Sequence, residues 1–289
     1  MHRRAGSGLS GPVTHPPGIL EPLGPGLARL LAPNPSPFTG EGTWVHLIGS
    51  DRLAILDPGP ADPAHLDAIV AAIGGRPVEA ILVTHTHRDH SPGAAPLSAA
   101  TGAPVWGCAP LAIPGDQEAG FDPDYAPDRV LADGETVALA GTRIEAVHTP
   151  GHTSNHLCFA WEHRLFSGDH VMGWSTTVVI PPDGHMGDYM ASLQKLQRRS
   201  ETLFHPAHGE PVEDPQRLLR GLLTHRIQRE RQLLRLAGEQ PGTVEELTGR
   251  AYPALDPRLV PAARATALAH LITLEEQGRV DCVQGIWKV

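Results

Sequence analysis

Short apolar blocks separated by polar turns run along the first two thirds of the chain, and they predict strands and helices in alternation. Residues 43–48, 53–56 and 80–83 are mostly apolar, which predicts buried strands. Before the third of them, Asp62-Pro63 opens a segment that keeps helical spacing up to Gly74-Gly75. Further strands are expected at 143–147, 156–161, 164–166 and 202–204, with a helix from Asp188. This alternation favours an α/β sandwich.

The sandwich is expected within residues 1–210, and the pattern changes beyond it. The glycine- and proline-rich first forty residues are expected to be irregular, with an extension to about residue 30. After residue 210, Asp214-Pro215 opens a long helical pattern that ends near Gly238. A capping box at 243–246 and a proline at 261 open two more helices, and residues 280–283 and 286–289 resemble a β-pair. Three helices and a small hairpin predict a winged-helix domain over residues 211–289.

Composition narrows the class of protein. The 289 residues are 40% hydrophobic and 19% charged, as in folded globular proteins, and the net charge of −9 disfavours a polybasic binder of nucleic acid or membranes. The N-terminal stretch lacks an apolar signal segment and no run of about 18 apolar residues exists. We therefore expect a cytoplasmic protein. The three cysteines lie far apart, so neither a disulfide framework nor a thiolate zinc site is indicated, but the 17 histidines stand out.

The strongest chemical signal is a cluster of histidines and one aspartate at the end of the strand at 80–83. Its sequence is Thr84-His85-Thr86-His87-Arg88-Asp89-His90. His152, Asp169 and His208 each follow a later predicted strand, where loops at one sheet edge converge. Imidazoles and carboxylates at this density suit Zn²⁺, with Fe or Mn as alternatives where oxygen ligands add up.

The remaining histidines are expected to be less informative. We interpret six of them as surface or packing residues: His46, His65, His163, His205, His225 and His270. His156 and His170 lie next to ligands in the sequence, where supporting the ligands and simple packing are equally good interpretations.

Together, these motifs resemble the metallo-β-lactamase fold superfamily of metallohydrolases. The resemblance implies an αββα sandwich and two metal ions that share one carboxylate. The matching positions are His85, His87 and His152 for the first ion, Asp89, His90 and His208 for the second, and Asp169 as the bridge.

Within that superfamily, the chain looks like the subgroup of β-lactamase-like protein 2, which carries a C-terminal winged helix. The likeness is in Asn34-Pro35-Ser36-Pro37-Phe38, Gly42-Thr43, Phe166-Ser167-Gly168-Asp169-His170, Asp188-Tyr189-Met190, His225-Arg226 and Arg229-Glu230. The subgroup includes a single-strand-directed endoribonuclease, and related fungal enzymes are polyketide thioesterases. One departure is Trp44-Val45-His46, where the family usually has a polar strand with Asn and Tyr.

The implied chemistry is hydrolysis by a hydroxide bound between two metal ions. Such ions bring the pKa of a bound water toward about 7 and polarise a carbonyl or phosphoryl oxygen, so no serine or cysteine nucleophile is needed. Asp89 is expected to orient or deprotonate the water. Single-stranded RNA and acyl thioesters are the expected substrates, and a glyoxalase II-like thioester hydrolase is an alternative. Trp174 and Thr177 are expected to line the substrate groove, and packing in the core is an equally good interpretation of Trp174.

A DNA-binding regulator is the non-enzyme alternative, because a winged helix is present. Bases and acids nearly balance over residues 211–289, and the candidate recognition helix from Pro261 carries one base, Arg264. Readers of the major groove need several basic or amide side chains, so we expect no sequence-specific DNA binding. The domain is expected to cover the site or to form a homodimer contact.

The arginines between 217 and 235 allow three interpretations. They form a solvated helix face, or they supply an anion site beside the metals, or Arg226 and Arg229 join the C-terminal domain to the catalytic one.

Overall fold

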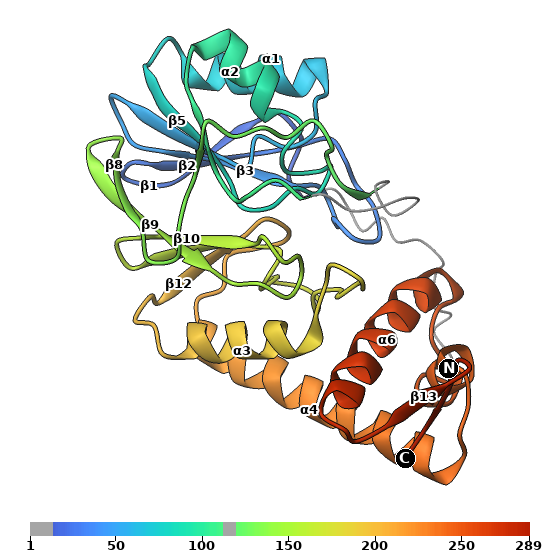
Figure 1. Ribbon diagram of the computed structural model, residues 1–289. Coiled ribbons are helices and arrows are strands. Elements are labelled where there is room, and N and C mark those ends of the chain that lie inside the picture. The colour runs from blue at the N-terminus through green and yellow to red at the C-terminus, as the bar shows by residue number, and fades with distance from the viewer. Residues whose placement is uncertain (1–13, 112–119) are drawn as a thin grey trace, which may run out of the picture.

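The computed structural model describes residues 14–111 and 120–289, and its main part is a four-layered αββα sandwich (Figure 1). Helices α1 (Pro63–Ile73) and α2 (Ala94–Thr101) cover one sheet. Helices α3 (Met186–Gln197) and α4 (Pro215–Glu239) lie beneath the other. The predicted α/β sandwich is therefore confirmed. In the part of the chain that the structure describes, no helix combines the length and apolarity that crossing a bilayer requires.

The first sheet has seven strands in sequence order, from β1 to β7. They are β1 (Leu20–Gly24), β2 (Leu27–Leu31), β3 (Trp44–Ile48), β4 (Leu53–Leu56), β5 (Val78–Val83), β6 (Val105–Gly107) and β7 (Arg129–Val130). The pairs from β1 to β4 are antiparallel. From β4 onward the pairs are parallel, and α1 and α2 are the crossovers from β4 to β5 and from β5 to β6.

The expectation that the first forty residues are irregular is wrong for residues 20–31, and residues 1–13 lie outside the described part of the chain. Strands β1 and β2 form a hairpin, and β2 continues the sheet by pairing with β3. Gly24 and Gly26 have positive φ angles and form the turn of this hairpin. Gly24 and Gly26 are therefore turn residues of regular structure, and Pro22 lies within strand β1.

The second sheet has five strands in the order β12-β11-β10-β9-β8. They are β8 (Thr136–Leu139), β9 (Thr142–His148), β10 (Leu157–Trp161), β11 (Arg164–Gly168) and β12 (Leu203–Pro206). All pairs are antiparallel except β11 with β12, which are connected by α3. Helix α3 begins two residues before the predicted start, because the His185 side chain accepts a hydrogen bond from the Asp188 amide and caps it.

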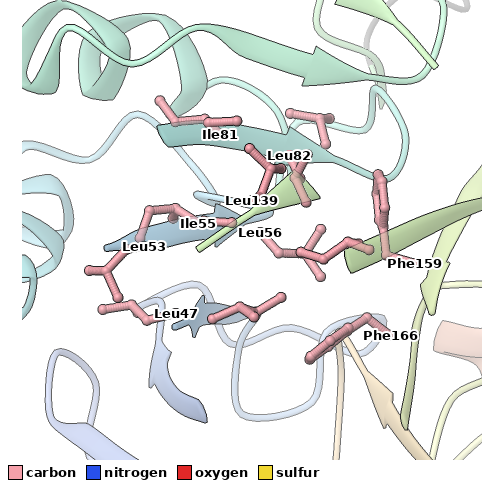
Figure 2. Close-up of a cluster of buried hydrophobic side chains, with 14 of the residues drawn as sticks. Leu47, Leu53, Ile55, Leu56, Ile81, Leu82, Leu139, Phe159 and Phe166 are labelled. Carbon is pink, nitrogen blue, oxygen red and sulfur yellow. The ribbon is translucent and has the colours of Figure 1, made fainter. Parts of the chain in front are cut away.

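The main hydrophobic core lies between the two sheets. Figure 2 shows Leu47, Ile55 and Leu82 from the first sheet close to Phe159 and Phe166 from the second. All five side chains are buried. Burial of this apolar surface holds the sheets face to face, so that the strand ends of both sheets meet at one edge.

The C-terminal part consists of α4, α5 (Val244–Ala251), α6 (Val260–Glu276) and the hairpin of β13 (Asp281–Val283) and β14 (Ile286–Lys288), with a short 3₁₀ turn at Pro257–Leu259. The predicted capping box is present, since Thr243 and Glu246 each accept a hydrogen bond from the other's backbone amide. The N-terminal half of α4 buries Leu219 and Leu222 against α3, whereas Leu233 and Leu236 pack with α5 and α6. One helix thus belongs to both hydrophobic cores.

Arg226 on α4 is buried, at 2% exposure, so the solvated-face interpretation is wrong for this residue. Its guanidinium donates to the carbonyl oxygen of Thr177 and lies 5.1 Å from the ring centre of Tyr189. Arg229 donates to the carbonyl of Ala251 and stacks on Tyr252, within the C-terminal part. The contacts of Arg226 fit the interpretation in which it joins α4 to the sandwich.

Candidate metal centre

All seven predicted ligand side chains come together at the edge where the strands of both sheets end. His85, His87, Asp89 and His90 follow β5 of the first sheet. His152, Asp169 and His208 follow β9, β11 and β12 of the second sheet. Their donor atoms form two four-membered groups, each within 4.8 Å: His85, His87, His152 and Asp169, and Asp89, His90, Asp169 and His208. The fold therefore gathers side chains up to 123 residues apart in sequence.

The first group is built around three imidazoles. His87 Nδ1 lies 3.0 Å from His85 Nε2 and 3.1 Å from His152 Nε2. Asp169 Oδ2 lies 3.5 Å from His152 Nε2 and 4.0 Å from His85 Nε2. Four ligand atoms around a tetrahedral zinc ion lie about 3.3 Å apart, so this spacing fits one ion.

The second group is built around the other oxygen of Asp169. Oδ1 lies 3.4 Å from His90 Nε2 and 3.2 Å from His208 Nε2. Asp89 Oδ2 lies 3.3 Å and 3.2 Å from the same two nitrogens. Asp169 therefore offers one carboxylate oxygen to each group.

Two buried atoms of this centre have no hydrogen-bond partner among the described residues: His90 Nε2 and Asp169 Oδ1. A buried polar atom without a partner costs about 1–3 kcal/mol, so such atoms are normally satisfied. Both atoms face the middle of the second group, where a cation would satisfy them. The donor set of nitrogen and carboxylate oxygen atoms thus fits divalent ions.

Without metal, the histidines of the first group and those of the second group differ in their pKa values. Burial lowers the pKa of His85, His87 and His152, to about 3 for His87, so these imidazoles are neutral and have free lone pairs. Burial also acts on His208, but the Asp169 carboxylate outweighs it and raises the pKa of His208 to about 10. The pKa of His90 is likewise raised, because the nearby carboxylates overcome its burial. The second group therefore attracts positive charge.

The outer nitrogen of several ligand imidazoles is held by an acceptor. His152 Nδ1 donates to the Val178 carbonyl at 2.8 Å, and His208 Nδ1 donates to the Gly42 carbonyl at 2.9 Å. His90 Nδ1 lies 3.0 Å from Asp57 Oδ2. These contacts fix ring orientation and leave the inner nitrogen to face the centre.

Asp57 is a functional residue that the sequence analysis missed. It stands at the end of β4 and accepts hydrogen bonds from both the amide and the hydroxyl of Thr84, at 2.8 Å each, besides contacting His90. Its φ of 47° is in the left-handed region, which aspartate tolerates better than most residues. The signal available in the sequence was a carboxylate directly after the strand at 53–56, which pairs with the strand that precedes the histidine cluster.

Two glycines allow backbone to pass close behind the ligands. A Cβ at Gly168 would lie 2.6 Å from His156 Nε2, which accepts a hydrogen bond from the Asp169 amide. A Cβ at Gly151 would lie 2.2 Å from the Tyr189 amide nitrogen. Both have positive φ angles, so a side chain at either position would displace the ligand that follows. His156 thus supports the bridging aspartate.

Thr177 and Trp174 have different surroundings, although both were expected to line the groove. Thr177 is buried, and its hydroxyl donates to the carbonyls of Asp169 at 2.6 Å and His170 at 3.1 Å. The groove-lining expectation is therefore wrong for Thr177, which instead holds the loop that carries Asp169. Trp174 is 49% exposed and lines a cavity beside the centre.

Comparison with known proteins agrees with this geometry. Residues 38–208 match the model of the metallo-beta-lactamase superfamily. The chain belongs to the metallo-β-lactamase superfamily. Residues 243–287 match the beta-lactamase associated winged helix domain, which confirms the predicted C-terminal winged helix. As a member of this superfamily, the chain is a hydrolase with a metal-binding cluster of histidine and aspartate.

Two kinds of relative are similar over long stretches. A beta-lactamase-like protein 2 homolog from Drosophila melanogaster is 31% identical over 87% of this chain and 88% of its own length. An atrochrysone carboxyl ACP thioesterase from Cryptosporiopsis is 32% identical over 75% of this chain, and the match spans 64% of that relative's length. Among solved structures, a beta-lactamase domain protein from Burkholderia ambifaria has a TM-score of 0.80 at 21% identity, covering 95% of each chain.

Proposed function

We propose that the protein is a thioesterase that binds two divalent ions, zinc first among them, through the seven side chains of the metal centre. The observation that carries the proposal is Asp169, whose two oxygens each face one group of histidines. When bound, the ions supply an acidified water as nucleophile and a Lewis acid for the substrate carbonyl. The fungal relatives named as thioesterases support the choice of bond. Three expectations from the sequence stay predictions: a domain boundary near residue 211, a cytoplasmic location and a homodimer.

Asp89 is the proposed proton acceptor. Its carboxylate is held by the Thr43 hydroxyl at 3.2 Å and remains 26% exposed, so it borders the space that a substrate enters. Burial would raise the pKa of Asp89, but His90 outweighs this effect and lowers it well below its usual range, so the group is ionised at neutral pH. In the proposed reaction, water forms a C–O bond as the C–S bond breaks. The water's proton passes to Asp89 and then to the departing thiolate.

DNA binding by the winged helix has less support. Helix α6 is packed against α3 of the sandwich, where the Thr273 hydroxyl accepts from the Gly187 amide and His185 pairs with Glu276. A recognition helix needs a free face to enter a groove. The contacts of α6 favour a winged-helix domain that packs against the catalytic sandwich and stabilises it.

A parallel activity screen tests the proposal. Purified protein with its metal content measured is incubated with acyl-coenzyme A, S-lactoylglutathione, single-stranded RNA and a β-lactam. We expect close to two transition-metal ions per chain and turnover of a thioester. Folded protein that was never exposed to chelator and holds no metal would overturn the metal assignment, and cleavage of RNA alone would replace the thioester by a phosphodiester.

A further inference from the structure

A cavity of about 720 Å³ lies beside the second group of ligands. Gly42 and Gly209 form part of its wall. The carbonyl of Gly42 accepts the hydrogen bond from His208, and Gly209 directly follows His208 in the chain. The cavity and the metal centre therefore share a single layer of backbone. Its volume is in the range of small-molecule sites, about 300–1,000 Å³.

The wall of the cavity is mostly apolar. Its apolar side chains are Pro17, Leu31, Pro33, Pro35, Trp44 and Trp174. The carboxylates of Glu41 and Glu210 also border it, together with the imidazole of His15, which pairs with Glu210 at 2.6 Å. No lysine or arginine is among the described residues that line it. Glu210 is paired with Arg29, which stacks on the Trp44 ring with its guanidinium carbon 3.7 Å from the ring centre. The cavity thus presents aromatic and aliphatic surface beside negative charge.

Trp174 is the most exposed part of this surface, since 49% of it is accessible to solvent. Its indole lies over two glycines. A Cβ at Gly209 would lie 2.7 Å from Trp174 Cδ1, and one at Gly40 would lie 3.6 Å from Cε2. Backbone without side chains therefore packs directly against this ring. Water in contact with such a ring is released when an apolar group takes its place, which favours binding.

The charge of the lining decides between the classes of occupant. Grooves for single-stranded nucleic acid combine stacking aromatics with basic side chains that follow the phosphates. Here the aromatics are present, but the wall carries the carboxylates of Glu41 and Glu210, and the one basic side chain among its described residues, His15, is already paired with Glu21 and Glu210, so the lining repels a polyanion rather than following its phosphates. An uncharged apolar group meets no such penalty.

We propose that this cavity binds the apolar acyl portion of the thioester substrate and that Trp174 is a specificity-determining residue. This inference rests on the thioesterase function proposed above. Trp44 is a second wall residue, and its indole is fixed by a hydrogen bond to the Gly209 carbonyl at 2.9 Å. Burial of each added methylene is worth about a factor of four, so longer acyl groups that reach the cavity are better substrates.

The test uses the metal-loaded full chain and N-acetylcysteamine thioesters, whose thiol half carries no charge. The kcat/KM is measured for acetyl, butyryl, hexanoyl and octanoyl esters. We expect a rise of about fourfold per methylene in the wild type. Trp174→Ala should lower kcat/KM for the octanoyl ester roughly tenfold and flatten the series, whereas Trp174→Phe keeps most of the slope. Val130→Ala, which truncates an exposed apolar residue outside the cavity, should leave kcat/KM for every ester of the series at the wild-type value.

Binding without turnover is measured by calorimetry with ketone analogues, in which a methylene replaces the thioester sulfur. Affinity should rise with acyl length and fall in Trp174→Ala. Equal kcat/KM across the acyl series, or an unchanged slope in Trp174→Ala, would overturn this inference while leaving the thioesterase function standing. Turnover of none of the thioesters by fully metallated protein would overturn the thioesterase function, and the ketone titration would still report on the cavity.

Discussion

Replacing Thr177 by valine should loosen the metal centre without touching a ligand. The side chain keeps its shape and loses only the hydroxyl that donates to the Asp169 carbonyl at 2.6 Å and to the His170 carbonyl at 3.1 Å. The opposite side of the Asp169 backbone is held by His156, which accepts from the Asp169 amide at 3.2 Å. Thr177→Val therefore leaves the bridging residue restrained on one side only.

The size of the effect follows from the number of bonds lost. A hydroxyl has one proton and donates one hydrogen bond at any moment, so the variant loses one hydrogen bond to a buried carbonyl. Leaving that carbonyl without a donor costs about 1–3 kcal/mol. Loss of a group that supports a metal ligand typically lowers metal affinity about 10–100-fold, or about 1.4–2.7 kcal/mol. The two magnitudes agree. We therefore expect zinc to bind Thr177→Val about 10–100-fold more weakly than it binds the wild type.

The measurement is a zinc titration in competition with a chelating dye. Thr177→Ser restores the hydroxyl and should recover most of the affinity. Thr176→Val removes a hydroxyl from the preceding residue of the loop and serves as the matched control. Wild-type affinity in Thr177→Val, or equal losses in the valine and serine variants, would refute the role of the hydroxyl.

Three further expectations follow from other contacts. Asp89→Asn should lower kcat by at least about 100-fold while the thermal midpoint of the metal-loaded protein stays near that of the wild type, and turnover near the wild-type rate would refute its role as proton acceptor. Arg226→Gln leaves the buried Thr177 carbonyl without its charged donor, so the free energy of unfolding in urea should fall by about 1–3 kcal/mol at low and high salt alike. Arg220 is exposed on the same helix, and the control variant Arg220→Gln should stay within about 0.5 kcal/mol of the wild type. Burial lowers the pKa of His205 to about 4 in the folded protein, whereas an unfolded histidine has a pKa of about 6.5. As the pH falls from about 6.5 toward 4, the unfolded chain therefore binds a proton at His205 that the folded protein does not bind, and the free energy of unfolding decreases. His205→Phe should therefore reduce the loss of stability between pH 7 and 5 by about 2 kcal/mol, and an unchanged pH slope would contradict this assignment.

The sequence predicts which side chains the fold gathers into the two groups, because their spacing is local or follows strand ends. Four of them stand within six residues, and alternation along the end of β5 is enough to aim His85 and His87 at one point. The winged helix can be predicted in the same way, since the capping box at Thr243 and the glycine after the end of α6, Gly278, are local signals.

Residues that act through backbone contacts between distant segments escape such patterns. Asp57 reaches His90 across a strand pair, and Arg226 reaches Thr177 from a helix that begins far along the chain. Neither contact leaves a spacing in the sequence. Strand β1 was missed for another reason: its alternating exposure is carried by Leu20, Pro22 and Gly24, which lack a typical strand composition.

Helix α4 couples the folding of the two family domains, because it lies between the matched stretches and completes the core of each. Removing the C-terminal part at the end of the first match would strip Leu219, Leu222 and Leu223 from the underside of α3 and leave an aggregation-prone apolar surface. By the same connection, ions bound at the sandwich edge would stabilise the winged helix by mass action without touching it. The winged helix then acts as a remote reporter of metal occupancy, readable by amide hydrogen exchange in α5 and α6.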